Sequence, residues 1–345
     1  MERTMKINHL PAYTYGWLHL NNADLTVKDA PVPADLKVEV PVHVVANESA
    51  RIAVPTGAGD ALTDYLKDVP VLSYDVLAGS IPAKPLRIRT DYAKDAQAGN
   101  VISLHLNAGT SLVAVMDLTS EATGFAALQT LFELEEDSHL TLVQILRPGE
   151  QFTLVNDIGG RVKDRADVHI IHVMLGGKEV YQGCRVNLEG RHSDLKTDIG
   201  YRLQGESKLD MNYYAYHTGK KTSCEIQADG VLADHAKKVF RGTIDFINGC
   251  AGSVGDERED VLLLSDDVVN QTIPLILCAE EDVEGNHGAT IGRLDEDALF
   301  YAESRGMDEA SVIEMMASAR IDAVIKKIPD ETTRTLLLPK EDDHD

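Results

Sequence analysis

Between residues 86 and 277 the sequence is a long run of short, strand-like segments. Alternating or continuous apolar stretches of this kind occupy residues 101–106, 139–146, 168–175 and 239–247. Clusters such as Asn107–Gly109 supply the turns between them. Helical periodicity is missing for roughly two hundred residues, and this absence rejects folds that alternate strands and helices.

The spacing and number of these segments help to choose among the all-β architectures that remain. They recur about every 10–14 residues, which suits a sandwich, a barrel or a β-solenoid. Aromatic residues make up 5% of the chain and Trp17 is the single tryptophan, a composition that suits a narrow, aliphatic core. Such a long run of short strands stacks most simply as similar coils over one core. The pattern therefore favours a parallel β-solenoid over a sandwich.

The two ends of the chain differ from this middle part. Residues 1–35 look irregular and carry several prolines, residues 38–45 alternate like a strand, and residues 61–66 suit a short helix capped by Asp60. The pattern divides the chain into a mixed N-terminal region (1–85), a β core (86–292), a helical region (293–338) and an acidic tail (339–345). We expect the tail to be disordered.

Beyond residue 293 the apolar period changes to 3.6. The sequence predicts a helix over residues 295–305, with Asp295 as N-cap and Gly306 as C-cap. Asp308 caps a second predicted helix, residues 309–328, which Pro329 ends. We expect its apolar stripe to cover the last coil of the β core, with a docking face for another protein as the alternative; the stripe is Val312, Ile313, Met316, Ala317, Ala319, Ala323 and Val324.

Charge and the N-terminal sequence limit the functional classes. With 33 basic and 56 acidic residues, the formal net charge is −23. This charge opposes binding to nucleic acid or to anionic membranes through a broad surface. The N-terminal segment lacks the apolar core of a signal peptide, and no apolar run reaches membrane-spanning length. We therefore expect a cytoplasmic protein.

The segment 283–306 carries the most specific chemistry. His287 is flanked by Gly285, Gly288 and Ala289, which indicates a bend that leaves the imidazole accessible to a metal or a partner surface. A lone histidine is more often structural. No Walker spacing and no nucleophile elbow is present in the sequence, so we expect no enzymatic activity from this chain.

The four cysteines do not form a zinc motif. None lies in a CxxC pair, and we expect buried, reduced thiols; they are Cys184, Cys224, Cys250 and Cys278. Cys250 and Cys278 flank the strands before His287 and approach it if those strands stack in adjacent coils. His217 and His235 suit turn or core positions.

An ordered set of motifs resembles the SufB/SufD family of iron–sulfur cluster assembly proteins, and more closely its SufD side. The matching pieces are residues 217–223, 230–244, 262–266, Pro274, 287–292 and 300–306. The resemblance implies a right-handed parallel β-helix flanked by N-terminal and C-terminal helical pieces. It also implies pairing with a SufB-like subunit through the late strands, and docking of a SufC-like ABC ATPase at the C-terminal helices. A cysteine desulfurase or sulfur carrier would act only indirectly.

The resemblance also assigns roles to residues. It places His287 at the subunit interface as a tentative metal ligand, where iron or a cluster passes transiently without being stably bound. Glu259, Glu284, Cys250 and Cys278 are further candidates there, although solvated carboxylates and buried thiols are the default interpretation. The ATPase-docking candidates are Asp295, Asp297, Phe300, Tyr301, Ser304, Arg305 and Gly306.

SufB-type scaffolds carry a cysteine a few residues before the segment that matches 262–266. Here Glu259 stands about where that cysteine would fall, and no cysteine is near it. This difference favours a SufD-like partner role. Two alternatives remain: a β-helical polysaccharide lyase or hydrolase, and a scaffold that works alone as a homodimer, since late strands with open edges permit self-pairing.

Overall fold

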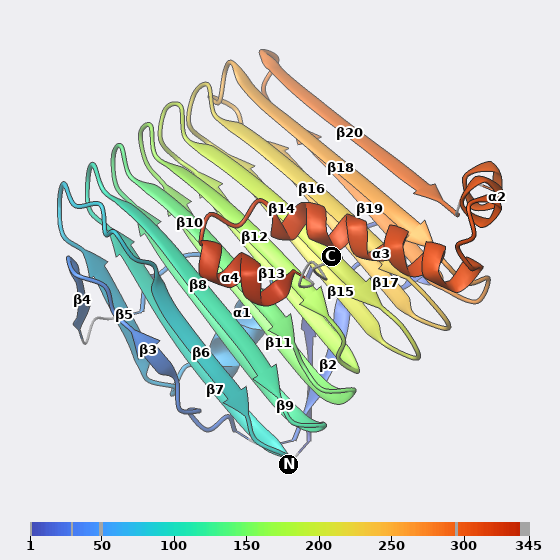
Figure 1. The fold of residues 1–345 in the computed structure, drawn as a ribbon. Coiled ribbons are helices and arrows are strands. Elements are labelled where there is room, and N and C mark those ends of the chain that lie inside the picture. The colour runs from blue at the N-terminus through green and yellow to red at the C-terminus, as the bar shows by residue number, and fades with distance from the viewer. Residues whose placement is uncertain (1, 29, 48–50, 294–295, 339–345) are drawn as a thin grey trace.

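The protein is a parallel β-solenoid built from two facing nine-stranded sheets (Figure 1). The computed structural model describes residues 2–28, 30–47, 51–293 and 296–338. Sheet I contains β3 (Lys37–Glu39), β6 (Leu86–Tyr92), β8 (Ser111–Ser120), β10 (His139–Arg147), β12 (Asp167–Leu175), β14 (Asp194–Leu203), β16 (Ser223–Leu232), β18 (Ser253–Leu263) and β20 (Val283–Gly292). Sheet II contains β4 (Val44–Asn47), β5 (Val71–Val76), β7 (Ala96–Leu106), β9 (Thr123–Leu134), β11 (Gln151–Val162), β13 (Glu179–Leu188), β15 (Lys208–His217), β17 (Lys237–Phe246) and β19 (Val269–Cys278).

The chain alternates between the two sheets, so one coil contributes one strand to each. His139 of β10 lies opposite Asp167 of β12, which sets a coil of 28 residues there. Between β16 and β18 the coil lengthens to 31 residues, with Ser223 opposite Val254. The parallel ladder begins with β5, ahead of residue 86. The expected solenoid is confirmed, and the predicted strand spacing corresponds to half a coil.

Side chains that point between the two sheets form a narrow, mainly aliphatic core. The core also contains a buried polar group. The Asn156 side-chain amide donates hydrogen bonds to Gln144, at 2.6 Å, and to Gln182, at 2.7 Å. His172 contacts Gln144 at 2.9 Å, and burial lowers its pKa to about 3, so its imidazole is neutral.

The N-terminal region covers the outer face of sheet II. Strands β1 (Arg3–Ile7) and β2 (Ala23–Val27) form an antiparallel hairpin, with a 3₁₀ turn, η1 (Gly16–Leu18), between them. The hairpin and α1 (Asp60–Tyr65) pack on apolar side chains of sheet II, including Phe125 and Tyr181. Two predictions were wrong here: residues 1–35 contain a regular hairpin, and Gly59 rather than Asp60 is the N-cap of α1.

Residues 38–45 were predicted as one strand but belong to two. β3 joins sheet I and β4 joins sheet II, each in antiparallel pairing with its neighbour. His43 lies between them with φ of 71°, a left-handed conformation that ends a strand. These two short strands lie at the N-terminal edge of the solenoid.

Three helices follow the solenoid: α2 (Glu296–Ser304), α3 (Glu309–Ile325) and α4 (Glu331–Leu337). Asp308 caps α3 as predicted, because its carboxylate accepts the Ser311 N–H at 2.9 Å. In the described parts of the chain no helix is long and apolar enough to cross a membrane.

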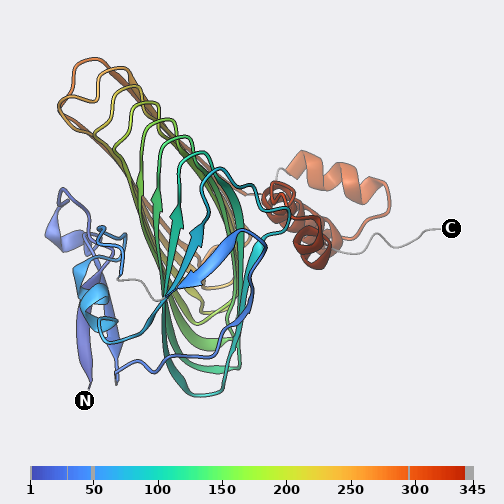
Figure 2. The ribbon, with the colours of Figure 1, turned by 90° about the vertical axis from the view of Figure 1, so that its left-hand side faces the viewer.

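The position of α3 differs from the prediction. It lies across the outer face of β12, β14 and β16 and reaches β18, where Arg320 pairs with Asp260, but it does not cover the end of the solenoid at β20 (Figures 1 and 2). Val324 rests against Gly200, where any added Cβ would come within 3.2 Å of it. Ala319 and Ala323 of the predicted stripe are exposed, and the buried face is Val312, Ala317, Ile321, Val324 and Ile325.

Candidate functional site

The C-terminal end of the solenoid is open. β19 and β20 each pair with a strand on one side only, and no described residue pairs with their outer edges. The segment around His287, residues 285–289, was predicted as a bend, but it lies within strand β20, which is held by its ladder with β18. An open strand edge presents unpaired N–H and C=O groups that can pair with another chain.

His287 points from β20 toward the interior of this open end. It lies in register with Glu257, and both residues alternate with the outward-facing side chains of their strands. Because no further coil covers β20, His287 is exposed, as predicted. Glu284 is in register with the exposed Val254, so it occupies the opposite face of β20, where Asn286 donates to it at 3.3 Å. The structure therefore does not bring His287 and Glu284 together.

Glu259 is not the solvated surface carboxylate that we expected. Its side chain is 1% exposed and forms an ion pair with Lys238, whose own side chain is completely buried. The Tyr201 hydroxyl donates to its Oε1 at 3.2 Å, and the Thr272 hydroxyl to its Oε2 at 2.5 Å. Both oxygens are thus occupied within the fold. Burial lowers the pKa of Lys238, while the Glu259 charge opposes that shift.

Glu257, which the sequence analysis did not identify, lies directly opposite His287 on the neighbouring strand β18. It is 2% exposed, and its Oε2 has no hydrogen-bond partner among the described residues. Gly242 makes room for the carboxyl group, since a Cβ at that position would lie 2.3 Å from Glu257 Cδ. Burial, and secondarily the negative charge of Glu259, raise the pKa of Glu257 to about 8. At neutral pH this side chain is mainly a neutral acid at the open end.

The cysteines occupy two kinds of environment. Cys184, Cys224 and Cys250 are buried, as predicted, and burial raises the pKa of each thiol. Cys278 was expected to be buried but is exposed at the end of β19, where its Sγ contacts the Glu280 carbonyl oxygen at 3.0 Å. In the parts of the chain that the structure describes, neither Cys250 nor Cys278 joins His287 in a group of three close metal-binding side chains.

The proposed ATPase-docking segment lies beside this open end. Phe300 and Tyr301 of α2 are 72% and 59% exposed, and Arg305 stacks 4.9 Å from the Tyr301 ring centre. Ser304 donates to the Tyr301 carbonyl oxygen at 2.7 Å, and Asp297 is exposed in the first turn. Asp295, the predicted N-cap, lies outside the described residues.

Gly306 ends α2 as predicted. Its φ is 94°, its N–H bonds the Glu303 carbonyl, and the Met307 N–H reaches the Ala302 carbonyl. This is the paired hydrogen-bond pattern that a C-terminal glycine allows.

A hollow of about 670 Å³ lies on the outer face of sheet I next to β20. Its lining residues come from β16, β18 and β20 and include Arg258, Asn286, His287 and Gly288. Charged and polar groups line it, so it suits a polar segment of a partner better than an apolar ligand.

Comparison with known proteins identifies the family to which the chain belongs. Residues 89–320 match the family model described as "SUF system FeS cluster assembly, SufBD core domain". The chain belongs to the SufBD family. This match includes β20 and most of α3, so the open end and the helical flank both fall within the SufBD core.

Individual relatives agree with that assignment. The iron–sulfur cluster assembly protein SufD of Bacillus subtilis is 27% identical over 150 residues, which cover 44% of this chain and 34% of that protein. SufD of Escherichia coli is 22% identical over 277 residues, which cover 77% of this chain and 64% of that protein. A chloroplastic SufBD family protein of Arabidopsis thaliana is 26% identical over 183 residues. This SufBD chain therefore spans about one third to two thirds of the lengths of these relatives.

Proposed function

We propose that this SufBD protein is a non-catalytic, SufD-like subunit of an iron–sulfur cluster assembly complex. In this proposal its open end pairs with the corresponding end of a SufB-like subunit, and α2 docks a SufC-like ABC ATPase. The open edges of β19 and β20 are the observation that carries the proposal, because no described strand continues either sheet beyond them.

Physical chemistry favours a partner at this end. Ile276 belongs to the core by register with Ile244 but is only partly buried. A second solenoid that continued both ladders would satisfy the backbone groups of β19 and β20 and cover this apolar surface. Self-pairing of two copies satisfies the same groups, so a homodimer of the isolated chain is compatible with the proposal.

The binding experiment uses the full chain together with a SufB-like subunit and an ABC ATPase. We expect all three to co-purify, and we expect Phe300→Ala combined with Tyr301→Ala to release the ATPase while the SufB-like subunit stays bound. Tyr15→Ala is the matched control, since Tyr15 is 75% exposed in the N-terminal hairpin region, on the face of the solenoid opposite the C-terminal helices. An ATPase that fails to bind the unmodified chain, or that binds the α2 variant equally well, contradicts the proposal.

Iron and sulfide are cargo in this function, and His287 is the residue we assign to them. An imidazole binds iron well, and this one is exposed at the proposed interface. Anaerobic cluster reconstitution on the complex should give a lower yield with His287→Ala than with His235→Ala, which removes an exposed turn histidine. Equal yields would remove His287 from the set of ligands.

A further inference from the structure

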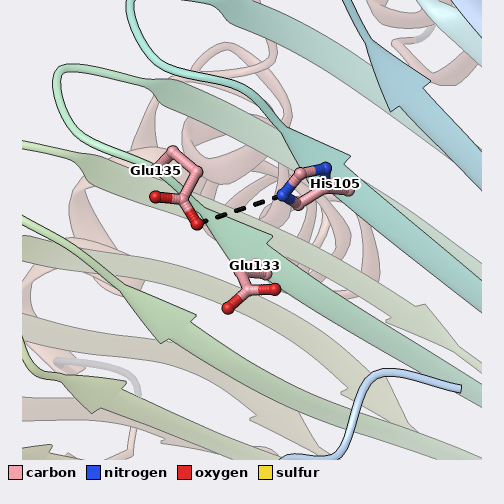
Figure 3. Close-up of side chains that lie close together, drawn as sticks. All are labelled: His105, Glu133 and Glu135. Carbon is pink, nitrogen blue, oxygen red and sulfur yellow. Dashed lines mark ion pairs between the residues drawn. The ribbon is translucent and has the colours of Figure 1, made fainter.

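A second histidine faces carboxylates near the opposite end of the solenoid. Asp75 of β5, His105 of β7 and Glu133 of β9 lie in one row, because each is in register with the next. Glu135 follows two residues after Glu133, immediately beyond β9. All four belong to the outward-facing positions of sheet II, and Figure 3 shows His105, Glu133 and Glu135 close together, with His105 and Glu135 joined by an ion pair.

The distances suit a metal site. One ligand atom from each of His105, Glu133 and Glu135 lies within 4.8 Å of the other two, and His105 Nε2 is 4.0 Å from Glu135 Oε1. Ligands about 2.1 Å from a tetrahedral ion lie roughly 3.4 Å apart. A rotation of the flexible glutamate side chains closes that gap. The side chains are 33%, 25% and 40% exposed, so an ion would be partly enclosed yet reachable.

The other nitrogen of His105 has a partner of its own. Asp75 Oδ1 lies 4.0 Å from Nδ1, and the Asn47 side-chain amide donates to the Asp75 carboxylate at 2.5 Å. A carboxylate on one ring nitrogen favours the tautomer that leaves the opposite nitrogen free to bind a metal. At 4.0 Å Asp75 lies just beyond hydrogen-bond distance of Nδ1, so a small shift of either side chain would let it accept from Nδ1 and position the ring for binding at Nε2.

Charge in this row is not balanced by the protein. Three carboxylates meet one described cation, Arg161, whose Nε lies 3.4 Å from Glu133 Oε1. Arg161 also donates to the Ala53 carbonyl oxygen at 2.6 Å, so part of its hydrogen-bonding capacity is directed elsewhere. A divalent ion would offset the remaining negative charge and would compete with Arg161 for Glu133.

We propose that His105, Glu133 and Glu135 bind one divalent transition-metal ion, with Asp75 as the positioning residue. One imidazole and two carboxylates suit Zn²⁺, Co²⁺, Mn²⁺ or Fe²⁺ and discriminate against the purely oxygen-seeking Mg²⁺. The site lies on β7 and β9, far along the ladder from β19 and β20, so it is independent of the proposed interface function.

The test titrates the chelator-stripped full chain with Co²⁺, followed by absorption, and with Zn²⁺, followed by calorimetry. We expect one ion per chain, at least tenfold weaker binding in His105→Gln, and no displacement by a large excess of Mg²⁺. His139→Gln is the matched control, because His139 of β10 is an exposed histidine in sheet I that pairs with Asp167 of β12. Wild-type affinity in His105→Gln, or displacement by Mg²⁺, overturns the proposal.

A third variant tests the same site by a change that should strengthen metal binding. Arg161→Gln removes the cation that competes for Glu133, so it should bind Zn²⁺ several-fold more tightly than the unmodified chain. Unchanged or weaker binding contradicts the assignment of Glu133. Thermal unfolding of each variant supplies the folding control, and Zn²⁺ should raise the melting temperature of the unmodified chain but not of His105→Gln.

Discussion

At the scale of single residues, the buried ion pair between Lys238 and Glu259 is the most sensitive point in the core. Both side chains are removed from water, and each depends on the other for its charge balance. Lys238→Met should lower the free energy of unfolding by about 3–5 kcal/mol, because it leaves a buried carboxylate without its counter-ion. The double variant Lys238→Met with Glu259→Met should recover most of that loss. Chemical denaturation checks this, and equal losses in the two variants contradict it.

Glu257 makes the stability of the protein depend on pH. Its pKa of about 8 in the folded state lies above the ordinary glutamate value, so the folded protein holds a proton that the unfolded chain releases. Its stabilising contribution is therefore complete below about pH 4.5 and decreases as the pH rises toward 8, by up to about 1.4 kcal/mol per pH unit.

The matched variant is Glu257→Gln, which keeps the shape of the side chain and removes the titration. The difference in unfolding free energy between it and the unmodified protein should change steadily between pH 5 and pH 8. Urea denaturation at several pH values measures this difference. Parallel curves for the two proteins would show that Glu257 is already ionised in the folded state.

The residue scale is also where the sequence was hardest to interpret. Glu259 was expected to be a solvated carboxylate, yet Glu257 and Glu259 are both buried and alternate with the outward-facing Asp256, Arg258 and Asp260. Alternation with the apolar Val261 was the available signal, because Val261 shares the inward face. The sequence could not predict Lys238 as the partner of Glu259, since that contact depends on the register between coils.

At the scale of elements, α3 stabilises the flank of the solenoid. Ile325 is 2% exposed and packs with β-strand side chains such as Val143 and Val173. Ile325→Ala should cost about 2–5 kcal/mol at this contact. Met315→Ala, at a position that is 51% exposed on the same helix, should cost little. Hydrogen exchange of the α3 amides compares the two variants, and equal protection in both would contradict the packing described here.

Helices and strands could be predicted from the sequence where the local pattern of apolar and capping residues determines the secondary structure. Most strands from β6 to β19 show the apolar periodicity of a buried solenoid wall, and Asp308 shows the chemistry of a helix cap. β11 is an exception, because Gly159 and Gly160 indicated a turn but lie within the strand. β20 was missed because Gly285, Gly288 and Gly292 weaken its strand signal, while pairing with β18 holds it extended. The stripe on α3 indicated a buried face but not its location, which depends on the groove next to Gly200.

At the scale of the whole molecule, one side of the solenoid carries the N-terminal hairpin and the other carries α3 and α4 (Figure 2). The flanks are covered, and the C-terminal end of the ladder is not. The sequence motifs identified the family and the solenoid, but α3 was predicted to cover the last coil and instead lies along the outer face of sheet I, reaching that coil only at β18. That correction leaves β19 and β20 available for the partner interaction that we propose.

Hydrogen exchange of the β20 amides tests this central claim most directly. The peptide 283–292 is followed in the isolated chain at low concentration and again after mixing with a SufB-like subunit. We predict that exchange slows in this peptide and in 269–278 on mixing, while the peptide 139–147, inside the ladder, is unchanged. A complex that forms without added protection of β19 and β20 would contradict pairing through the open end.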